Sequence, residues 1–115
     1  MRAIAKTRPG PGVEIIDAPE PQVAPGQVKL RLEAASVCGT DLHIYKWDAW
    51  SASRIVPPRI IGHEFCGTIV EVGEGVHDRH IGDFVSSESH IVCGRCKQCL
   101  AGQGHVCVNT RIFGV

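Results

Sequence analysis

Four cysteines near the C-terminal end of the chain constrain its fold more than any other feature. They are Cys93, Cys96, Cys99 and Cys107, with the spacing C-x2-C-x2-C-x7-C. A C-x2-C pair can present two sulfurs to one ion, because the residues between the cysteines form a tight knuckle. Four thiolates at about 2.3 Å in a tetrahedron make a closed structural zinc site, with no position left for a substrate. The spacing therefore predicts a zinc-binding lobe at residues 93–107.

Two other uses of these cysteines are alternatives. Bacterial ferredoxins also begin C-x2-C-x2-C, but they continue with x3-C-P, whereas here the last gap is seven residues and Val108 follows. Three disulfides in a small secreted domain would also use six cysteines. The close spacing and the lack of a secretory segment at the N-terminus favour thiolate–metal chemistry in a reducing cytoplasm. His105 could replace one sulfur, although four cysteines suffice.

The overall composition narrows the class of protein further. The chain has 115 residues, of which 43% are hydrophobic, so we expect one domain with one core. Its 12 basic and 12 acidic residues balance. The chain therefore has no excess of positive charge to attract a nucleic acid or an anionic membrane, which disfavours both as partners. No apolar run approaches the roughly 18 residues of a membrane span.

Short alternating segments separated by glycine and proline indicate a mostly β fold. Residues 28–37 alternate cleanly, which predicts a strand that buries Val28, Leu30, Leu32 and Ala34 on one face and ends at Cys38. The other expected elements are a hairpin from 3–5 and 13–17, a short helix or loop over 40–50, a strand with a glycine bend within 60–72, and a strand over 84–92.

A second group of possible metal ligands follows the expected strands. Cys38 ends one strand, and His63-Glu64 lies in an apolar run about 25 residues later. If these residues converge, three or fewer protein ligands would leave a position open for a substrate oxygen, as in catalytic zinc sites. The spacing alone is weak evidence for such a site, because a lone cysteine such as Cys38 is more often a small core residue. HExxH chemistry is excluded, because the fourth residue after His63 is Gly67.

Taken together, four motifs resemble the zinc-dependent medium-chain alcohol dehydrogenases. They are CGTDLH, GHEFCGTIVEVG, GDFV and CGRCKQC followed by a fourth cysteine, and they span nearly the whole chain in the family's order. The run HIYKWDAW narrows the resemblance to the branch that oxidises an amino-acid hydroxyl rather than a polyol. The resemblance implies a GroES-like, partly open β-barrel with short helices and a zinc-binding lobe.

The resemblance also implies roles for individual residues. Cys38 and His63 match ligands of a catalytic zinc, and Glu64 matches a nearby carboxylate that is a ligand in some states. Thr40 and His43 match a proton relay that leads towards solvent through the ribose of the bound NAD. Asp41 matches a carboxylate that orients the zinc-bound histidine. The set of Cys93, Cys96, Cys99 and Cys107 matches the structural zinc, and His90 is a candidate for the substrate pocket.

Parts of the family pattern do not occur in this sequence. There is no βαβ unit and no G-x-G-x-x-G, so no NAD-binding Rossmann domain is predicted. Residues 1–115 match an incomplete N-terminal catalytic domain, and a further ligand of the catalytic zinc would lie beyond them. We therefore expect a catalytic site short of one ligand and no turnover by the isolated chain. Open barrel edges predict self-association, and a homo-oligomer follows from the family.

Three functions are consistent with these observations. The first is the catalytic-domain portion of a zinc- and NAD-dependent dehydrogenase that acts on an amino acid or another alcohol. The second is a zinc-stabilised module without chemistry of its own, and the third is an iron–sulfur electron carrier. The substrate assignment depends on the resemblance alone.

Overall fold

The computed structural model describes all 115 residues. The strands are β1 (Arg2–Lys6), β2 (Glu14–Asp17), β3 (Val28–Ala35), β4 (Arg59–Ile60), β5 (Phe65–Val72), β6 (Phe84–Ser86), β7 (His90–Ile91) and β8 (Arg111–Ile112). The helices are α1 (Gly39–Lys46), α2 (Ala49–Arg54), α3 (Lys97–Leu100) and the 3-10 turn η1 (Gly104–Val106). The predominance of strands over short helices confirms the predicted fold class.

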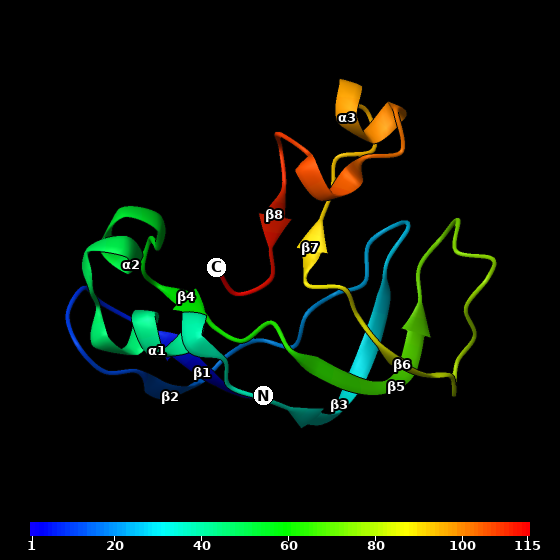
Figure 1. Cartoon of the computed structure of the whole chain (residues 1–115). Helices are drawn as coiled ribbons and strands as arrows, with labels where there is room; N and C mark the ends of the chain where they lie inside the picture. Colours follow the sequence, from blue (N-terminus) through cyan, green and yellow to red (C-terminus); the bar gives the residue numbers. More distant parts are fainter.

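The strands form three small antiparallel sheets, in the orders β2-β1-β4, β3-β5-β6 and β7-β8. The predicted hairpin at the N-terminus is present, with Ala3 opposite Ile16 in β1 and β2. The sheets do not close on one another, which agrees with the expected partly open barrel (Figure 1).

The β3–β5 ladder is the longest in the molecule and positions the candidate site. It pairs Val28 with Val72 at one end and Ala35 with Phe65 at the other. Two register shifts interrupt it, and Gly67 lies opposite Leu32 between them. A Cβ on Gly67 would lie 2.3 Å from the carbonyl oxygen of Arg31, so only glycine allows the strands to approach this closely.

Two predicted features of the strands are wrong. The strand at 84–92 is two strands in different sheets, because the polar residues between them bond locally: the Glu88 carboxylate accepts from the backbone N–H of His90 at 3.1 Å. The predicted apolar face of β3 is also only partly buried, and the side chain of Leu32 is exposed. The bulges displace the alternation there, and the strand ends at Ala35 rather than at Cys38.

The core is thinner than the composition predicts. Ile44 and Ile69 are fully buried, but many large apolar side chains, including Ile15 and Phe84, remain exposed. Lys6 is buried as well; its ammonium donates to the carbonyl of Gly12 at 2.7 Å and lies 4.8 Å from the centre of the Trp47 ring. No helix has the length and apolarity that a membrane crossing requires.

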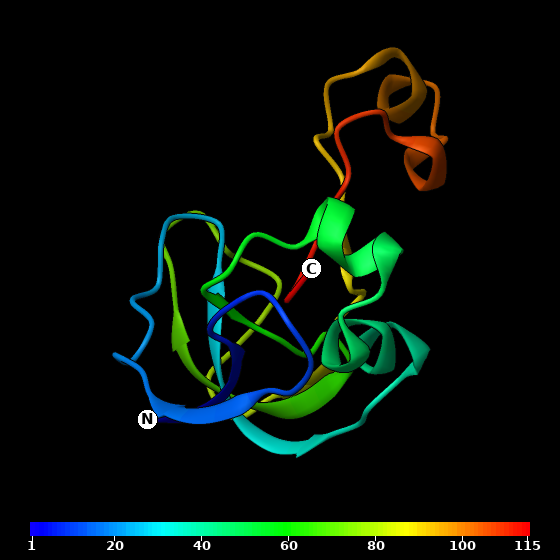
Figure 2. The same ribbon diagram turned by 90° about the vertical axis from the view of Figure 1, so that its left-hand side faces the viewer.

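The lobe that contains α3 and η1 stands apart from the rest of the molecule. Figures 1 and 2 show it (orange) projecting from the body on the β7–β8 pair, while α1 and α2 lie against the body. The chain thus separates into a β body with two helices and a projecting lobe at residues 93–107.

Candidate metal centres

The β3–β5 ladder brings the first candidate centre together. Because Ala35 pairs with Phe65, the residues that follow β3 lie beside those that precede β5. The backbone N–H of Ser36 continues the pairing by donating to the carbonyl of Glu64 at 3.0 Å. As a result the Cys38 sulfur lies 3.0 Å from Nε2 of His63, although 25 residues separate them in the sequence.

Cys38 is the N-cap of α1. Its sulfur accepts a hydrogen bond from the backbone N–H of Thr40 at 3.2 Å, and its own N–H donates to Oδ2 of Asp41 at 3.0 Å. The sequence CGTD therefore folds into a cap whose acceptor is a sulfur.

His63 and Asp41 form the buried side of this centre. Their side chains are about 10% and 7% exposed, and Nδ1 of His63 lies 3.9 Å from Oδ1 of Asp41. Neither of these two atoms has a hydrogen-bond partner. A metal on Nε2 would require a proton on Nδ1 and would give it the Asp41 carboxylate as its partner, so these unsatisfied atoms fit a metal-binding histidine.

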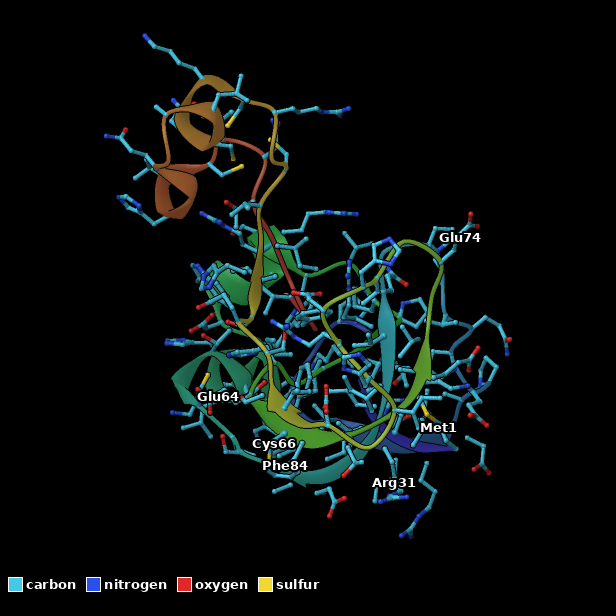
Figure 3. The ribbon with its side chains drawn as sticks, turned by 90° about the vertical axis from the view of Figure 1, so that its right-hand side faces the viewer. Met1, Arg31, Glu64, Cys66, Glu74 and Phe84 are labelled. Carbon is cyan, nitrogen blue, oxygen red and sulfur yellow. The ribbon has the colours of Figure 1, made fainter.

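Glu64 completes the first centre from the exposed side. Cys38, His63 and Glu64 each offer one ligand atom, and these three atoms lie within 4.8 Å of one another. Figure 3 shows Glu64 beside the ribbon of α1. The Glu64 carboxylate also accepts a hydrogen bond from the Ser36 hydroxyl. The three side chains could therefore hold a cation, with Glu64 shared between it and Ser36.

A hollow of about 450 Å³ opens beside this centre. His63 and Glu64 are among its lining residues, and so is the polar turn after β6. The lining residues are Ala34, Ala35, Ser36, His63, Glu64, Phe65, Cys66, Ser86, Ser87, Glu88 and Ser89. The hollow is large enough for a small molecule and carries hydroxyl and carboxylate groups.

The structure places the other predicted site residues, Thr40, His43 and His90, differently with respect to the first centre and its hollow. Thr40 and His43 are three residues apart on α1, so their side chains share a face of that helix. His43 is about half exposed, and its Nδ1 contacts Oδ2 of Asp48. His90 does not line the hollow; its Nδ1 lies 2.7 Å from the carboxylate of Glu88, which does.

The second candidate centre is the lobe, where all four predicted cysteines meet. Four of the sulfur–sulfur distances are 3.5, 3.6, 3.9 and 4.0 Å, and all four sulfurs lie within 4.8 Å of one another. A tetrahedron with zinc–sulfur bonds of about 2.3 Å has edges of about 3.8 Å. The cysteines thus fit a four-thiolate zinc site without rearrangement, whereas the 3.0 Å between the Cys38 sulfur and His63 Nε2 is shorter than such an edge. All six cysteines are free.

Backbone and amide donors prepare the lobe for thiolates. The backbone N–H of Arg95 and the side-chain amide of Asn109 lower the pKa of Cys93 to about 6, the latter from 3.6 Å. Backbone donors from Cys93 and Asn109 also lower the pKa of Cys107. Burial raises the pKa of Cys99 to about 12, so this thiol keeps its proton until a cation displaces it.

Three residues around the centres were not predicted from the sequence. Ser36 contacts Glu64, Asp48 contacts His43, and Asn109 donates to Cys93. Only Asp48 had a local signal: Asp-x-x-Ser before a short polar segment is typical of a helix N-cap. The other two contacts depend on strand register and on the fold of the lobe, which single residues do not reveal.

Comparison with known sequences defines the class of this chain. Residues 24–115 match the alcohol dehydrogenase GroES-like domain, and the chain belongs to that family. Within it, the chain is 55% identical to the L-threonine 3-dehydrogenase of Pyrococcus horikoshii over all 115 residues and 50% identical to that of Cutibacterium acnes over 114. These relatives are named for activity on the hydroxyl of an amino acid, which agrees with what the resemblance of the HIYKWDAW run implied.

Solved structures give the same class. The fold matches an NAD-dependent alcohol dehydrogenase with a TM-score of 0.88 at 32% identity, covering 99% of this chain and 33% of that one. It also matches a zinc-dependent alcohol dehydrogenase from Streptococcus pneumonia with a TM-score of 0.81 at 31% identity, covering 100% of this chain and 32% of that one. The chain likewise spans about a third of the length of the Pyrococcus and Cutibacterium enzymes, while they cover 100% and 99% of it.

Proposed function

We propose that residues 1–115 are the metal-binding portion of the catalytic domain of a zinc- and NAD-dependent L-threonine 3-dehydrogenase. The reaction would convert threonine and NAD⁺ to 2-amino-3-oxobutyrate, NADH and a proton. The observation that carries this proposal is the convergence of Cys38, His63 and Glu64 beside a hollow, at the start of the helix that carries Thr40 and His43.

Cys38 and His63 would hold the catalytic zinc in this proposal, with Glu64 as a further or alternating ligand. When bound, zinc would act as a Lewis acid that lowers the pKa of the substrate hydroxyl. Asp41 would accept a hydrogen bond from the Nδ1–H of His63 and keep the imidazole turned toward Cys38. The four cysteines of the lobe would hold the structural zinc.

Thr40 and His43 would move the proton of the substrate hydroxyl. Thr40 would accept it at Oγ1 while passing on its own hydroxyl proton, and His43 would release a proton toward water through the cofactor ribose. His43 is suited to the outer position because its side chain is about half exposed. Hydride from the same substrate carbon would go to NAD⁺, which balances the oxidation.

The hollow would hold the substrate. Its serines and the carboxylates of Glu64 and Glu88 can bond the ammonium of an amino acid. His90 would act on this pocket through Glu88. A polyol or another alcohol is the alternative substrate of the same chemistry, and the 50–55% identity to L-threonine 3-dehydrogenases favours threonine.

NAD would bind to the part of the relatives that this chain does not match. We therefore expect no turnover by residues 1–115 alone. The exposed apolar side chains and the open sheet edges support association with a second copy or with further protein surface. Six free cysteines support a reducing compartment such as the cytoplasm.

A chimera tests the proposal. Residues 1–115 would replace the matching segment of the Pyrococcus horikoshii enzyme, and turnover of threonine and of a simple polyol would be compared. We expect NAD-dependent oxidation of threonine, and a loss of at least about 100-fold in kcat for Thr40→Ala and for His43→Ala with two zinc ions per chain retained.

Two results would redirect the proposal. Loss of zinc in the Thr40→Ala or His43→Ala chimera would show that these residues support the metal rather than the proton. A chimera that binds both zinc ions yet oxidises neither substrate would favour a zinc-stabilised module without chemistry. Absorbance near 400 nm from iron in the purified chain would favour the iron–sulfur carrier instead.

A further inference from the structure

His43 is held from outside its own helix. Trp47 ends α1 in the left-handed conformation (φ 57°), and its N–H donates to the carbonyl of His43 at 2.9 Å. Because the chain reverses direction at Trp47, the side chain of Asp48, the N-cap of α2, points back toward His43. Oδ2 of Asp48 contacts Nδ1 of the imidazole, and the ring of Trp50 packs against it with centroids 5.8 Å apart.

The Asp48 carboxylate is itself fixed in direction. Its Oδ1 accepts the backbone N–H of Ser51 at 3.0 Å, as the N-cap of α2. The Ser51 hydroxyl, on a fully buried residue, donates to the Asp48 carbonyl at 3.0 Å. One carboxylate oxygen thus belongs to the helix cap and the other to His43. The Ser51 N–H and the His43 contact hold the pKa of Asp48 below its ordinary value, so the group is ionised at neutral pH and can only accept.

An acceptor at Nδ1 decides which imidazole nitrogen carries the proton. With Asp48 ionised, the neutral ring must place its hydrogen on Nδ1 and leave Nε2 bare. A bare Nε2 is the atom that can take a proton from a hydroxyl. We propose that Asp48 is a positioning residue that fixes the tautomer and ring direction of His43 for proton transfer. This inference has a structural half, the tautomer and ring direction of His43, and a catalytic half, the use of that tautomer in proton transfer. Only the catalytic half rests on the proposed function.

Asp48→Asn separates the two halves. Asparagine caps helices as well as aspartate does, so its Oδ1 would remain on the Ser51 N–H. Its amide would then face His43 and donate to Nδ1, which moves the imidazole hydrogen to Nε2. Nitrogen-15 NMR of the histidine ring at about pH 8 reports this tautomer directly in the zinc-loaded chain. We expect the Nδ1–H form to predominate in the wild type and the Nε2–H form in Asp48→Asn.

Ser51→Ala is the matched control. It removes a hydrogen bond from the same cap but leaves the carboxylate in place, so the His43 tautomer should stay that of the wild type. An Nε2–H tautomer in the wild type, or an unchanged tautomer in Asp48→Asn, would overturn the inference. If Asp48→Asn does not fold, the wild-type tautomer alone still decides between these outcomes.

The chimera described above tests the catalytic half. Asp48→Asn should lower kcat by at least about 10-fold with KM nearly unchanged and both zinc ions present, as expected for a histidine in the wrong tautomer. If Asp48→Asn is active despite a switched tautomer while His43→Ala is inactive, the inference about Asp48 is overturned and the proposed function is not. A fully active His43→Ala would instead remove the relay of the proposed function.

Discussion

The two candidate metal centres differ in how they are assembled. The lobe takes its four ligands from one 15-residue segment and closes on itself, with sulfur spacings already those of a zinc tetrahedron. The other centre takes Cys38 and His63 from segments 25 residues apart, holds three donors, and opens onto a hollow. A local, closed site suits a structural ion, whereas a site built across a sheet can leave room for a reactant.

The largest effect should come from breaking the lobe. Cys96→Ser should release one zinc and unfold residues 93–107, because metal binding there is coupled to folding, and should lower the Tm by about 10 °C or more. Metal analysis and calorimetry measure both. Cys66→Ser is the control, since Cys66 is a free cysteine outside both clusters. Equal losses in the two variants would show that the lobe is not the stabilising centre.

This contrast also explains what the sequence could predict. The lobe was predictable as a ligand set because its spacing is local, and CGTD was predictable as a motif. The meeting of Cys38 with His63 depends on the pairing of Ala35 with Phe65, which alternation alone does not determine. The same limit explains the wrong burial of Leu32, since two bulges reset the faces of β3. The division of residues 84–92 depends on side-chain bonds to Glu88 that a strand pattern does not show.

The second prediction targets the ladder that assembles the open centre. Gly67→Ala would place a methyl group 2.3 Å from the Arg31 carbonyl oxygen, which must force β3 and β5 apart. We expect a loss of about 2–3 kcal/mol in the free energy of unfolding and release of the zinc at Cys38, with the lobe still loaded. Denaturant titration and zinc content check this. Gly104→Ala, whose methyl would meet Val92 at an ordinary 3.6 Å, should retain both properties.

The two centres should differ in how steeply their zinc affinity falls as the pH is lowered. The pKa of Cys93 is lowered from 9.0 to about 6 in the folded chain, so its thiolate contributes stability above pH 9 that is lost as the pH falls through about 6. The lobe has four cysteine ligands and the open centre has one, so zinc binding releases more thiol protons at the lobe. The logarithm of zinc affinity should therefore fall more steeply with pH at the lobe. Competition with a chromogenic chelator at pH 5–7 measures both slopes, and parallel slopes would contradict the assignment.

The smallest effect should come from Ser36→Ala. The Ser36 hydroxyl holds one oxygen of Glu64, so its removal frees that carboxylate for a metal. We expect zinc affinity at the open centre to rise by less than about 10-fold, while the lobe is unaffected. Isothermal titration resolves the two events. A decrease in affinity would mean that Ser36 positions Glu64 for binding rather than competing for it.

The two-residue ladder between β7 and β8 has a topological consequence. His90 faces Ile112 and Ile91 faces Arg111, so the chain leaves the body and returns to it at neighbouring points. Residues 92–110 are therefore an insertion in the barrel, and the order of strands β1 to β6 does not depend on what lies between those points. Residues of the lobe other than its four cysteines can therefore change while the body keeps its register, which makes the tip of the lobe a suitable place to attach a label or another domain.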